Sequence, residues 1–272
     1  MPDFLDEMAR GSRERARAIA HRAGELLVEA ERKEPPLPLV LGDLGVIAEV
    51  KPRAPSSGVL GGGDVADALV RARAYALGHA SCVSVLTEPS RFEGSIEHLV
   101  AIARLLRPYD IPAMRKDFLV DPIQVVEARA AGASGVLLVT RMLDDAQLGE
   151  MTHAAQALRM FVLIEAFDED DLARAARAIE ASPTGLFLGV NTRDLRTLTT
   201  DRTRLERLAR VLPHDVEAVA ESGIESPDDV RAAVRCGYRG VLVGTALMRA
   251  TDPASVVLAL RDAGREEAQS CT

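Results

Sequence analysis

The sequence predicts an α/β protein, a single (β/α)8 barrel preceded by an extra N-terminal helix. Short apolar runs recur along the 272-residue chain, and alanine- and arginine-rich stretches with helical periodicity lie between them. Almost wholly apolar runs are typical of parallel strands that are buried on both faces. Eight such strands, each followed by a helix, occupy about 230 residues, which is close to the ~250 residues of a typical barrel of this kind.

The eight expected strands are, in chain order, Leu44–Val50, Cys82–Thr87, Ile111–Arg115, Gly135–Thr140, Phe161–Glu165, Gly185–Val190, Asp215–Ala220 and Gly240–Gly244. Two of the helices between them, Pro122–Ala131 and Pro227–Cys236, carry clear apolar stripes. Asp121 and Ser226 precede these helices as N-cap residues, with proline at the first helical position. A doubly wound sheet is the main alternative, but its glycine-rich fingerprint is absent after the first strand.

The first 38 residues differ in sequence pattern from the rest of the chain. Residues 1–33 have the pattern of one amphipathic helix rich in arginine and glutamate, and residues 34–38 form a proline-rich linker. We therefore divide the chain into an N-terminal helical extension with its linker, residues 1–38, and a catalytic barrel, residues 39–272. The extension is expected to cover one end of the barrel.

Composition excludes several classes of protein. The formal net charge of -8 and the sequence pI of about 5.3 argue against a nucleic-acid partner. No segment approaches the ~20 apolar residues that span a bilayer, and the acidic N-terminus does not resemble a signal peptide. The three cysteines lack CxxC spacing and the five histidines are scattered. We expect a cytoplasmic monomer or homodimer without a metal.

Lysine is nearly absent, and the positions where it remains are informative. Of 33 basic residues only Lys33, Lys51 and Lys116 are lysine. Lys33 lies in a charged run, whereas Lys51 and Lys116 each close a predicted strand. A desolvated lysine can lose its proton and an arginine effectively cannot, so the two differ in proton-transfer chemistry. We interpret Lys51 and Lys116 as functional; the alternative is that two lysines simply escaped replacement.

Other polar residues fall at the same ends of the predicted strands. In a barrel of this kind, catalytic groups lie at the C-terminal strand ends and in the loops that follow. Besides the two lysines, these positions hold Glu49, Glu165, Asn191, Arg193 and Glu221. Because buried ionisable groups are costly to desolvate, this set predicts an active site. The structural alternative is a group of ion pairs that only closes the barrel.

Two glycine-bearing turns predict a phosphate site. Ser222-Gly223 follows the seventh expected strand, and Gly244-Thr245 follows the eighth. Loops at these two places form the recurrent phosphate site of such barrels. Glycine lets backbone N–H groups approach the anion, and the two hydroxyls add donors. A phosphorylated small-molecule substrate is therefore expected.

Several motifs together resemble the indole-3-glycerol phosphate synthase family, in order and with ordinary spacing from about residue 44 to 260. The most specific are Lys116-Asp-Phe118, Asn191-Thr-Arg-Asp-Leu195 and Glu221-Ser-Gly-Ile224. The resemblance implies a lyase of tryptophan biosynthesis that uses no metal or organic cofactor. Such an enzyme closes the indole ring of 1-(2-carboxyphenylamino)-1-deoxyribulose 5-phosphate, with loss of CO₂ and water.

The resemblance also implies roles for individual residues. Lys116 looks like the general acid that protonates the substrate ketone, and Glu165 like the carboxylate that assists as base. Glu49 and Lys51 resemble the pair that serves decarboxylation and dehydration, although the division of steps between the lysines stays open. Asn191 resembles an orienting group. The implied substrate-binding residues are Arg193, Phe92, Phe118, Leu137, Glu221, Ser56, Ser222, Gly223, Gly244 and Thr245.

The chain departs from the family pattern after the first strand. The family usually has Ser-Pro-Ser there, and the first serine is replaced by Ala54. One phosphate hydroxyl is therefore expected to be missing, with Ser56 or Ser57 as its substitute. Three alternatives remain: a paralogue that closes a modified indole in specialised metabolism, another sugar-phosphate barrel lyase or isomerase, and a non-catalytic binding protein.

Overall fold

The computed structural model describes residues 4–55, 57–194, 199–213 and 215–270. Within these residues, eight parallel strands close into one barrel, in which β10 pairs with β1. The strands are β1 (Gly45–Val50), β4 (Cys82–Leu86), β5 (Ala113–Lys116), β6 (Gly135–Val139), β7 (Phe161–Ala166), β8 (Leu186–Asn191), β9 (Ala218–Glu221) and β10 (Gly240–Val243). The predicted (β/α)8 TIM barrel is confirmed.

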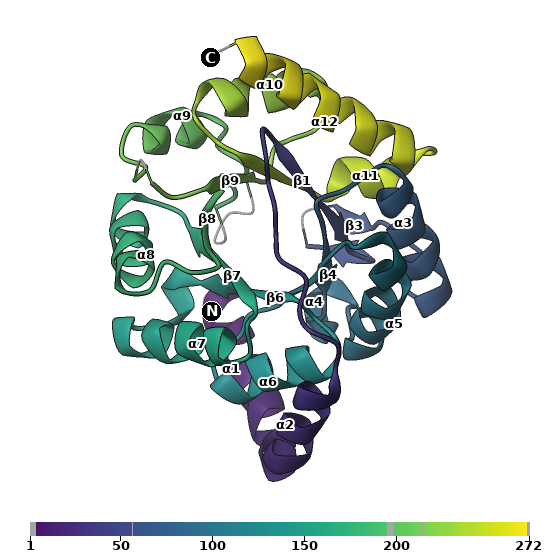
Figure 1. Cartoon of the computed structure of the whole chain (residues 1–272), viewed down its shortest axis with the longest axis vertical. Helices are drawn as coiled ribbons and strands as arrows, with labels where there is room; N and C mark the ends of the chain where they lie inside the picture. The colour runs from purple at the N-terminus through teal and green to yellow at the C-terminus, as the bar shows by residue number, and fades with distance from the viewer. Residues whose placement is uncertain (1–3, 56, 195–198, 214, 271–272) are drawn as a thin grey trace.

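Helices surround the barrel on its outside (Figure 1). The longer ones are α3 (Val65–Leu77), α5 (Ile96–Leu106), α6 (Pro122–Ala130), α7 (Asp145–Ala157), α8 (Glu169–Ala181), α9 (Thr203–Ala209), α10 (Pro227–Arg235) and α12 (Pro253–Ser270). Two short helices, α4 (Pro89–Phe92) and α11 (Thr245–Arg249), follow strand ends directly. Asp121 and Ser226 are N-caps as expected, each in a reciprocal capping box with the residue three positions later.

The strands are buried on both faces, which explains their apolar runs. Val46, Ile47 and Ala48 follow one another on β1 and are all fully buried. Alternate side chains fill the barrel or pack beneath the helices, so neither face can be polar. The seventh expected strand is shorter than predicted and begins at Ala218, because Asp215 and Glu217 before it are exposed.

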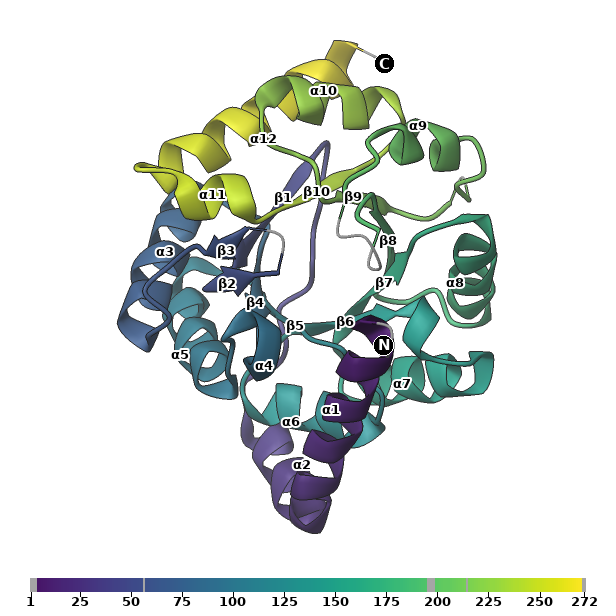
Figure 2. The same ribbon diagram turned by 180° about the vertical axis from the view of Figure 1, so that it is seen from behind.

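The predicted N-terminal helical segment is present, and a short turn divides it into two helices. α1 (Phe4–Ile19) and α2 (Ala23–Arg32) are separated by a single 3₁₀ turn. Met8 of α1 packs into the main core, whereas Leu26 of α2 packs against Ala130 on the outside of α6. A straight helix could not bury both apolar stripes on these different surfaces. Figure 2 shows α1 at the edge of the barrel mouth, beside α4 and α6.

A small hairpin that the sequence pattern did not predict follows β1. Its strands, β2 (Arg53–Ala54) and β3 (Gly58–Val59), pair antiparallel with Ala54 opposite Gly58. Arg53 forms an ion pair with Glu93, just after α4, with 2.6 Å between Nη1 and Oε1. No helix in the described part of the chain is long and apolar enough to cross a membrane.

Candidate active site

A cavity of about 400 Å³ opens at the C-terminal ends of the strands. Every residue predicted for the site lines it except Ser56, which lies outside the described residues. These lining residues are Glu49, Lys51, Phe92, Lys116, Phe118, Leu137, Glu165, Asn191, Arg193, Glu221, Ser222, Gly223, Gly244 and Thr245. The barrel therefore brings together side chains that lie up to two hundred positions apart in the sequence.

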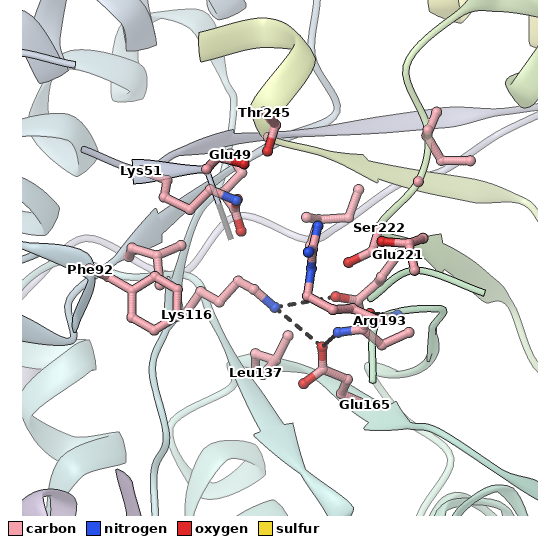
Figure 3. Close-up of a pocket in the computed structure, with 18 of the residues that line it drawn as sticks. Glu49, Lys51, Phe92, Lys116, Leu137, Glu165, Arg193, Glu221, Ser222 and Thr245 are labelled. Atoms are coloured by element: carbon pink, nitrogen blue, oxygen red, sulfur yellow. Dashed lines mark hydrogen bonds and ion pairs between the residues drawn. The ribbon is translucent and has the colours of Figure 1, made fainter. Parts of the chain in front are cut away.

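Lys116, the last residue of β5, reaches into this cavity (Figure 3). Its Nζ lies 3.4 Å from Glu165 Oε1 and 3.3 Å from Glu221 Oε2. Burial alone would lower the pKa of Lys116. The attraction of the carboxylates outweighs it and raises this pKa above the ordinary lysine value. Lys116 is therefore an ammonium group at neutral pH and carries a proton that it can donate.

Glu49, on β1, and Lys51, just after it, line another part of the cavity and are two residues apart along the chain (Figure 3). Lys51 Nζ is 2.5 Å from Glu49 Oε2. Burial opposes the ionised form of Glu49, but Lys51 and Lys116 together hold its pKa below the usual range. A Cβ atom at position 244 would overlap the Glu49 carboxylate, so Gly244 leaves the space that this ion pair occupies.

Glu221 ends β9 and behaves differently from Glu49. Burial raises the pKa of Glu221 to about 8, and the Glu165 carboxylate adds to that rise while Lys116 opposes it. Its Oε1 is buried and has no hydrogen-bond partner among the described residues. A Cβ atom at Gly189 would overlap the same oxygen. Glu221 is thus a buried carboxyl group beside a lysine ammonium that holds its proton more tightly than an ordinary glutamate does.

Asn191, at the end of β8, orients Glu165. Its Nδ2 donates to Glu165 Oε1 at 2.6 Å, and its Oδ1 accepts from the Arg193 backbone N–H at 2.8 Å. The amide is held by this backbone donor and in turn fixes one carboxylate oxygen beside the Lys116 ammonium. An ordered carboxylate of this kind can accept a proton at a defined place.

Apolar side chains form another part of the wall. The rings of Phe92, on α4, and Phe118, after β5, have centroids 6.0 Å apart. Leu137 lies nearby in the cavity wall, together with Leu86 and Val139, which the sequence reasoning missed. Strand register could have indicated Leu86, because it pairs with Lys116 and so points into the same barrel interior.

The two glycine turns shape the region expected to bind phosphate. Ser222 and Gly223 both have left-handed backbone conformations, with φ of 66° and 74°. Both residues line the cavity, so the chain makes a sharp turn beside it at the end of β9, where Gly223 adopts this conformation without steric cost. Thr245 begins α11 on the other side of this region, and Arg249, missed by the sequence reasoning, lies one helical turn further and lines the cavity.

In the loop after β1, the cavity is lined by Ser57 and not by Ala54. Ala54 is buried in the β2–β3 hairpin and does not line the cavity, whereas Ser57 does. The hydroxyl that the family pattern places at position 54 is absent, and Ser57 is the serine of this loop that lines the cavity among the described residues. Arg202, also missed, lines the cavity and is paired with Asp229 at 2.6 Å.

The family model for indole-3-glycerol phosphate synthase matches residues 37–260. The chain belongs to this family. A protein named indole-3-glycerol phosphate synthase from Nocardioides sp. is 46% identical over 212 residues, 78% of each chain. One of the same name from Opitutus terrae is 40% identical over an alignment covering 96% of this chain and 99% of the relative.

Solved structures of lower identity share the fold of this indole-3-glycerol phosphate synthase family member. A 3-hexulose-6-phosphate synthase from Salmonella typhimurium matches with a TM-score of 0.64 at 17% identity, covering 82% of this chain and 100% of that one. A thiamine phosphate pyrophosphorylase from Pyrococcus furiosus matches with a TM-score of 0.61, also at 17% identity, covering 84% and 98%. These likenesses concern the barrel architecture alone.

Proposed function

We propose that this chain catalyses the reaction of its family, the closure of an indole ring. The substrate is 1-(2-carboxyphenylamino)-1-deoxyribulose 5-phosphate, and the products are indole-3-glycerol phosphate, CO₂ and water, in tryptophan biosynthesis. The observation that carries this proposal is the Lys116 ammonium between Glu165 and Glu221, in the same cavity as the Glu49–Lys51 pair. Condensation, decarboxylation and dehydration each need a proton to be given or taken at a defined atom.

The cavity offers a different surface to each part of the substrate. The phosphate lies against the turns at Ser222-Gly223 and Gly244-Thr245, and the benzoate ring lies against the wall that Phe92 and Phe118 form. Arg193 faces the substrate carboxylate, and Leu137 completes the apolar wall. These assignments are supported by the common lining of one cavity and by the left-handed turn at Ser222 and Gly223.

Ring closure begins when the ring carbon that bears the carboxylate attacks the ketone carbon. Lys116 donates a proton to the ketone oxygen as that oxygen becomes negative. No proton is released in this step, so Glu165 assists as a base later, when a C–H proton is lost. The carbon–carboxylate bond then breaks, CO₂ leaves, and its electron pair restores the aromatic ring. A proton supplied to the new hydroxyl group lets it leave as water, and loss of a neighbouring C–H proton forms the ring double bond.

The Glu49–Lys51 pair serves the decarboxylation and dehydration steps. The lowered pKa of Glu49 keeps its carboxylate ionised, and Lys51 Nζ lies within 2.5 Å of it, so the pair holds a base and an amine side by side. Each well-placed acid or base contributes roughly 10²–10⁴-fold to the rate. Lys51, Lys116 and Arg193 also supply the positive charge that a doubly anionic substrate requires within an acidic protein.

A fluorescence assay for indole formation tests this function. Wild-type protein with the carboxyphenylamino-deoxyribulose phosphate should form indole-3-glycerol phosphate and CO₂ in equal amounts, and Lys116→Ala should not. The same assay after dialysis against a chelator tests the prediction that no metal is needed. Absence of product from folded wild-type protein would contradict the proposal and favour a paralogue with a substituted substrate.

We also propose that the enzyme works in the cytoplasm as a monomer or homodimer, with its phosphorylated substrate as partner and with neither nucleic acid nor membrane. The net charge of -8 and the free thiols of Cys82 and Cys236 support this. The division into an extension, residues 1–38, and a catalytic barrel, residues 39–272, stays a prediction.

A further inference from the structure

Two buried carboxylates lie beside the cavity, next to the residues that form its aromatic wall. Asp117 stands between Lys116 and Phe118, and Glu88 is the N-cap of the short helix that carries Phe92. The side chains of Asp117 and Glu88 are 0% and 1% exposed. Each carboxylate therefore belongs to a loop that presents one of the two rings to the cavity.

The Asp117 carboxylate fixes the loop after β5. Oδ1 accepts the backbone N–H of Phe118 at 2.8 Å, and Oδ2 accepts the Thr87 hydroxyl at 2.7 Å. Arg115 Nη2 donates to Oδ2 at 3.2 Å. Charge-assisted hydrogen bonds of this kind are stronger and more directional than neutral ones. The position of Phe118 thus depends on where the Asp117 carboxylate is held.

Glu88 fixes the other loop in a similar way. Its carboxylate accepts backbone N–H groups of Ser90 at 2.9 Å, Arg91 at 2.7 Å and Phe92 at 3.3 Å. These amides are the first donors of α4, which have no partner within so short a helix. The orientation of Phe92 therefore depends on where the Glu88 carboxylate is held.

Arg15 of α1 connects the two carboxylates. Its Nη2 lies 2.8 Å from Asp117 Oδ1, and its Nη1 lies 3.8 Å from Glu88 Oε1. The planar guanidinium has two arms with fixed geometry, so it can face two acceptors at a set separation. The contact spans 102 positions of sequence between Arg15 and Asp117.

Other residues of α1 contact the same two loops. The Phe4 ring stacks edge-on against Phe118, with centroids 5.8 Å apart. Glu7 pairs with Arg91 of α4 at 2.8 Å. Figure 2 shows α1 running past α4 at the edge of the mouth. The helix thus contacts both ring-bearing loops through a partly buried ion pair, an aromatic contact and a more exposed ion pair.

We propose that Arg15 is a positioning residue for the ring-binding wall. It holds Asp117 and Glu88 at a fixed distance and thereby sets the spacing of Phe118 and Phe92 and the place of the substrate ring. The inference rests on the proposed function, because the ring is that of the proposed substrate. It adds a requirement that α1 be docked before the ring can be bound in the reactive geometry.

The test compares Arg15→Met with Arg17→Met, a matched change at an exposed position of the same helix. In Arg15→Met, amide hydrogen exchange at Ser90, Phe92 and Phe118 should be about tenfold faster, with the barrel strands unchanged. The KM for the substrate and the dissociation constant of anthranilate should each rise about tenfold, since misplaced binding groups lose contact with the ring. The dissociation constant of inorganic phosphate should not change.

Arg15→Lys keeps the charge but reaches one carboxylate at most, so it should recover only part of the affinity for anthranilate. If Arg15→Met does not fold, the comparison of Arg15→Lys with the wild type takes its place, and anthranilate should then bind more weakly to Arg15→Lys while phosphate binds equally to both. Equal losses for anthranilate and phosphate, or exchange rates equal to those of Arg17→Met, would overturn the proposal. Exchange and anthranilate binding need no turnover, so these readouts stand even if the wild type forms no indole.

Discussion

Two glycines make room for the acidic side chains of the site. Gly189 lies against Glu221, and Gly244 lies against Glu49. Neither glycine has a left-handed backbone conformation, so their role is the absence of a side chain rather than a special turn. A residue of any other type would have to displace a buried carboxylate from beside its lysine.

We predict that Gly189→Ala lowers the free energy of unfolding by about 1–3 kcal/mol, the usual cost of overpacking a tight interior. It should also lower kcat, because the added methyl group displaces Glu221. Chemical denaturation and steady-state kinetics measure both effects. Gly149→Ala is the control, since nothing lies within 4 Å of a Cβ atom there. Equal stability of the two variants would contradict the steric role of Gly189.

The raised pKa of Glu221 predicts a pH dependence of stability. The unfolded side chain releases its proton near its ordinary pKa of 4.5, whereas the folded one keeps it up to about 8. The folded state therefore binds more protons in this window, and stability falls as pH rises through it. A glutamine at position 221 has no proton to release. The free energy of unfolding of Glu221→Gln should therefore fall less steeply between pH 4.5 and about 8 than that of the wild type. If the free energy of unfolding changed with pH in the same way for both proteins, the raised pKa of Glu221 would be ruled out.

Ser57 is predicted to bind the substrate phosphate in place of the missing hydroxyl at position 54. Ser57→Ala should raise KM about tenfold with little change in kcat, because a hydrogen bond to a charged group made equally in ground and transition states affects binding alone. Ala54→Ser is the matched change, and it should leave KM unaltered since Ala54 is buried in the hairpin. An unaltered KM for Ser57→Ala together with a lowered KM for Ala54→Ser would refute this assignment.

At the scale of elements, strand periodicity and helix-start residues were predictable because they depend on local chemistry. Apolar runs located the barrel strands, and Asp121 and Ser226 were identified as N-caps from their side chains and the following prolines. The break between α1 and α2 was not predictable, because it depends on which distant surfaces the two halves contact. The β2–β3 hairpin was missed since its strands are only two residues long.

The capping box at the start of α6 predicts how much stability the loss of its N-cap residue removes. Asp121 accepts the backbone N–H of Ile123 at 3.0 Å, and the side chain of Gln124 accepts the N–H of Asp121 at 3.2 Å. Asp121→Ala should lower the free energy of unfolding by ~1 kcal/mol, the usual effect of losing an N-cap. Thermal denaturation measures this, and KM should stay constant. A large rise in KM would mean that α6 positions the site directly.

At the scale of the whole molecule, the site exists because the barrel closes. Residues on β1, β5, β7, β8 and β9 reach one cavity only when parallel strands end at the same mouth, a rule that made the main polar groups predictable from sequence. The Arg15–Asp117 contact was not predictable, since neither position carries a local signal for the other. Arg202 and Arg249 were missed for a similar reason, because surface arginines are common in this chain.

The central claim is that Lys116, held between Glu165 and Glu221, donates the proton that starts ring closure. The most direct test is kcat for Lys116→Arg, measured by indole fluorescence beside thermal denaturation of the same sample. Arginine keeps the positive charge but cannot readily give up its proton, so kcat should fall by at least about 10²-fold with the melting temperature nearly unchanged. A kcat close to that of the wild type would contradict the claim.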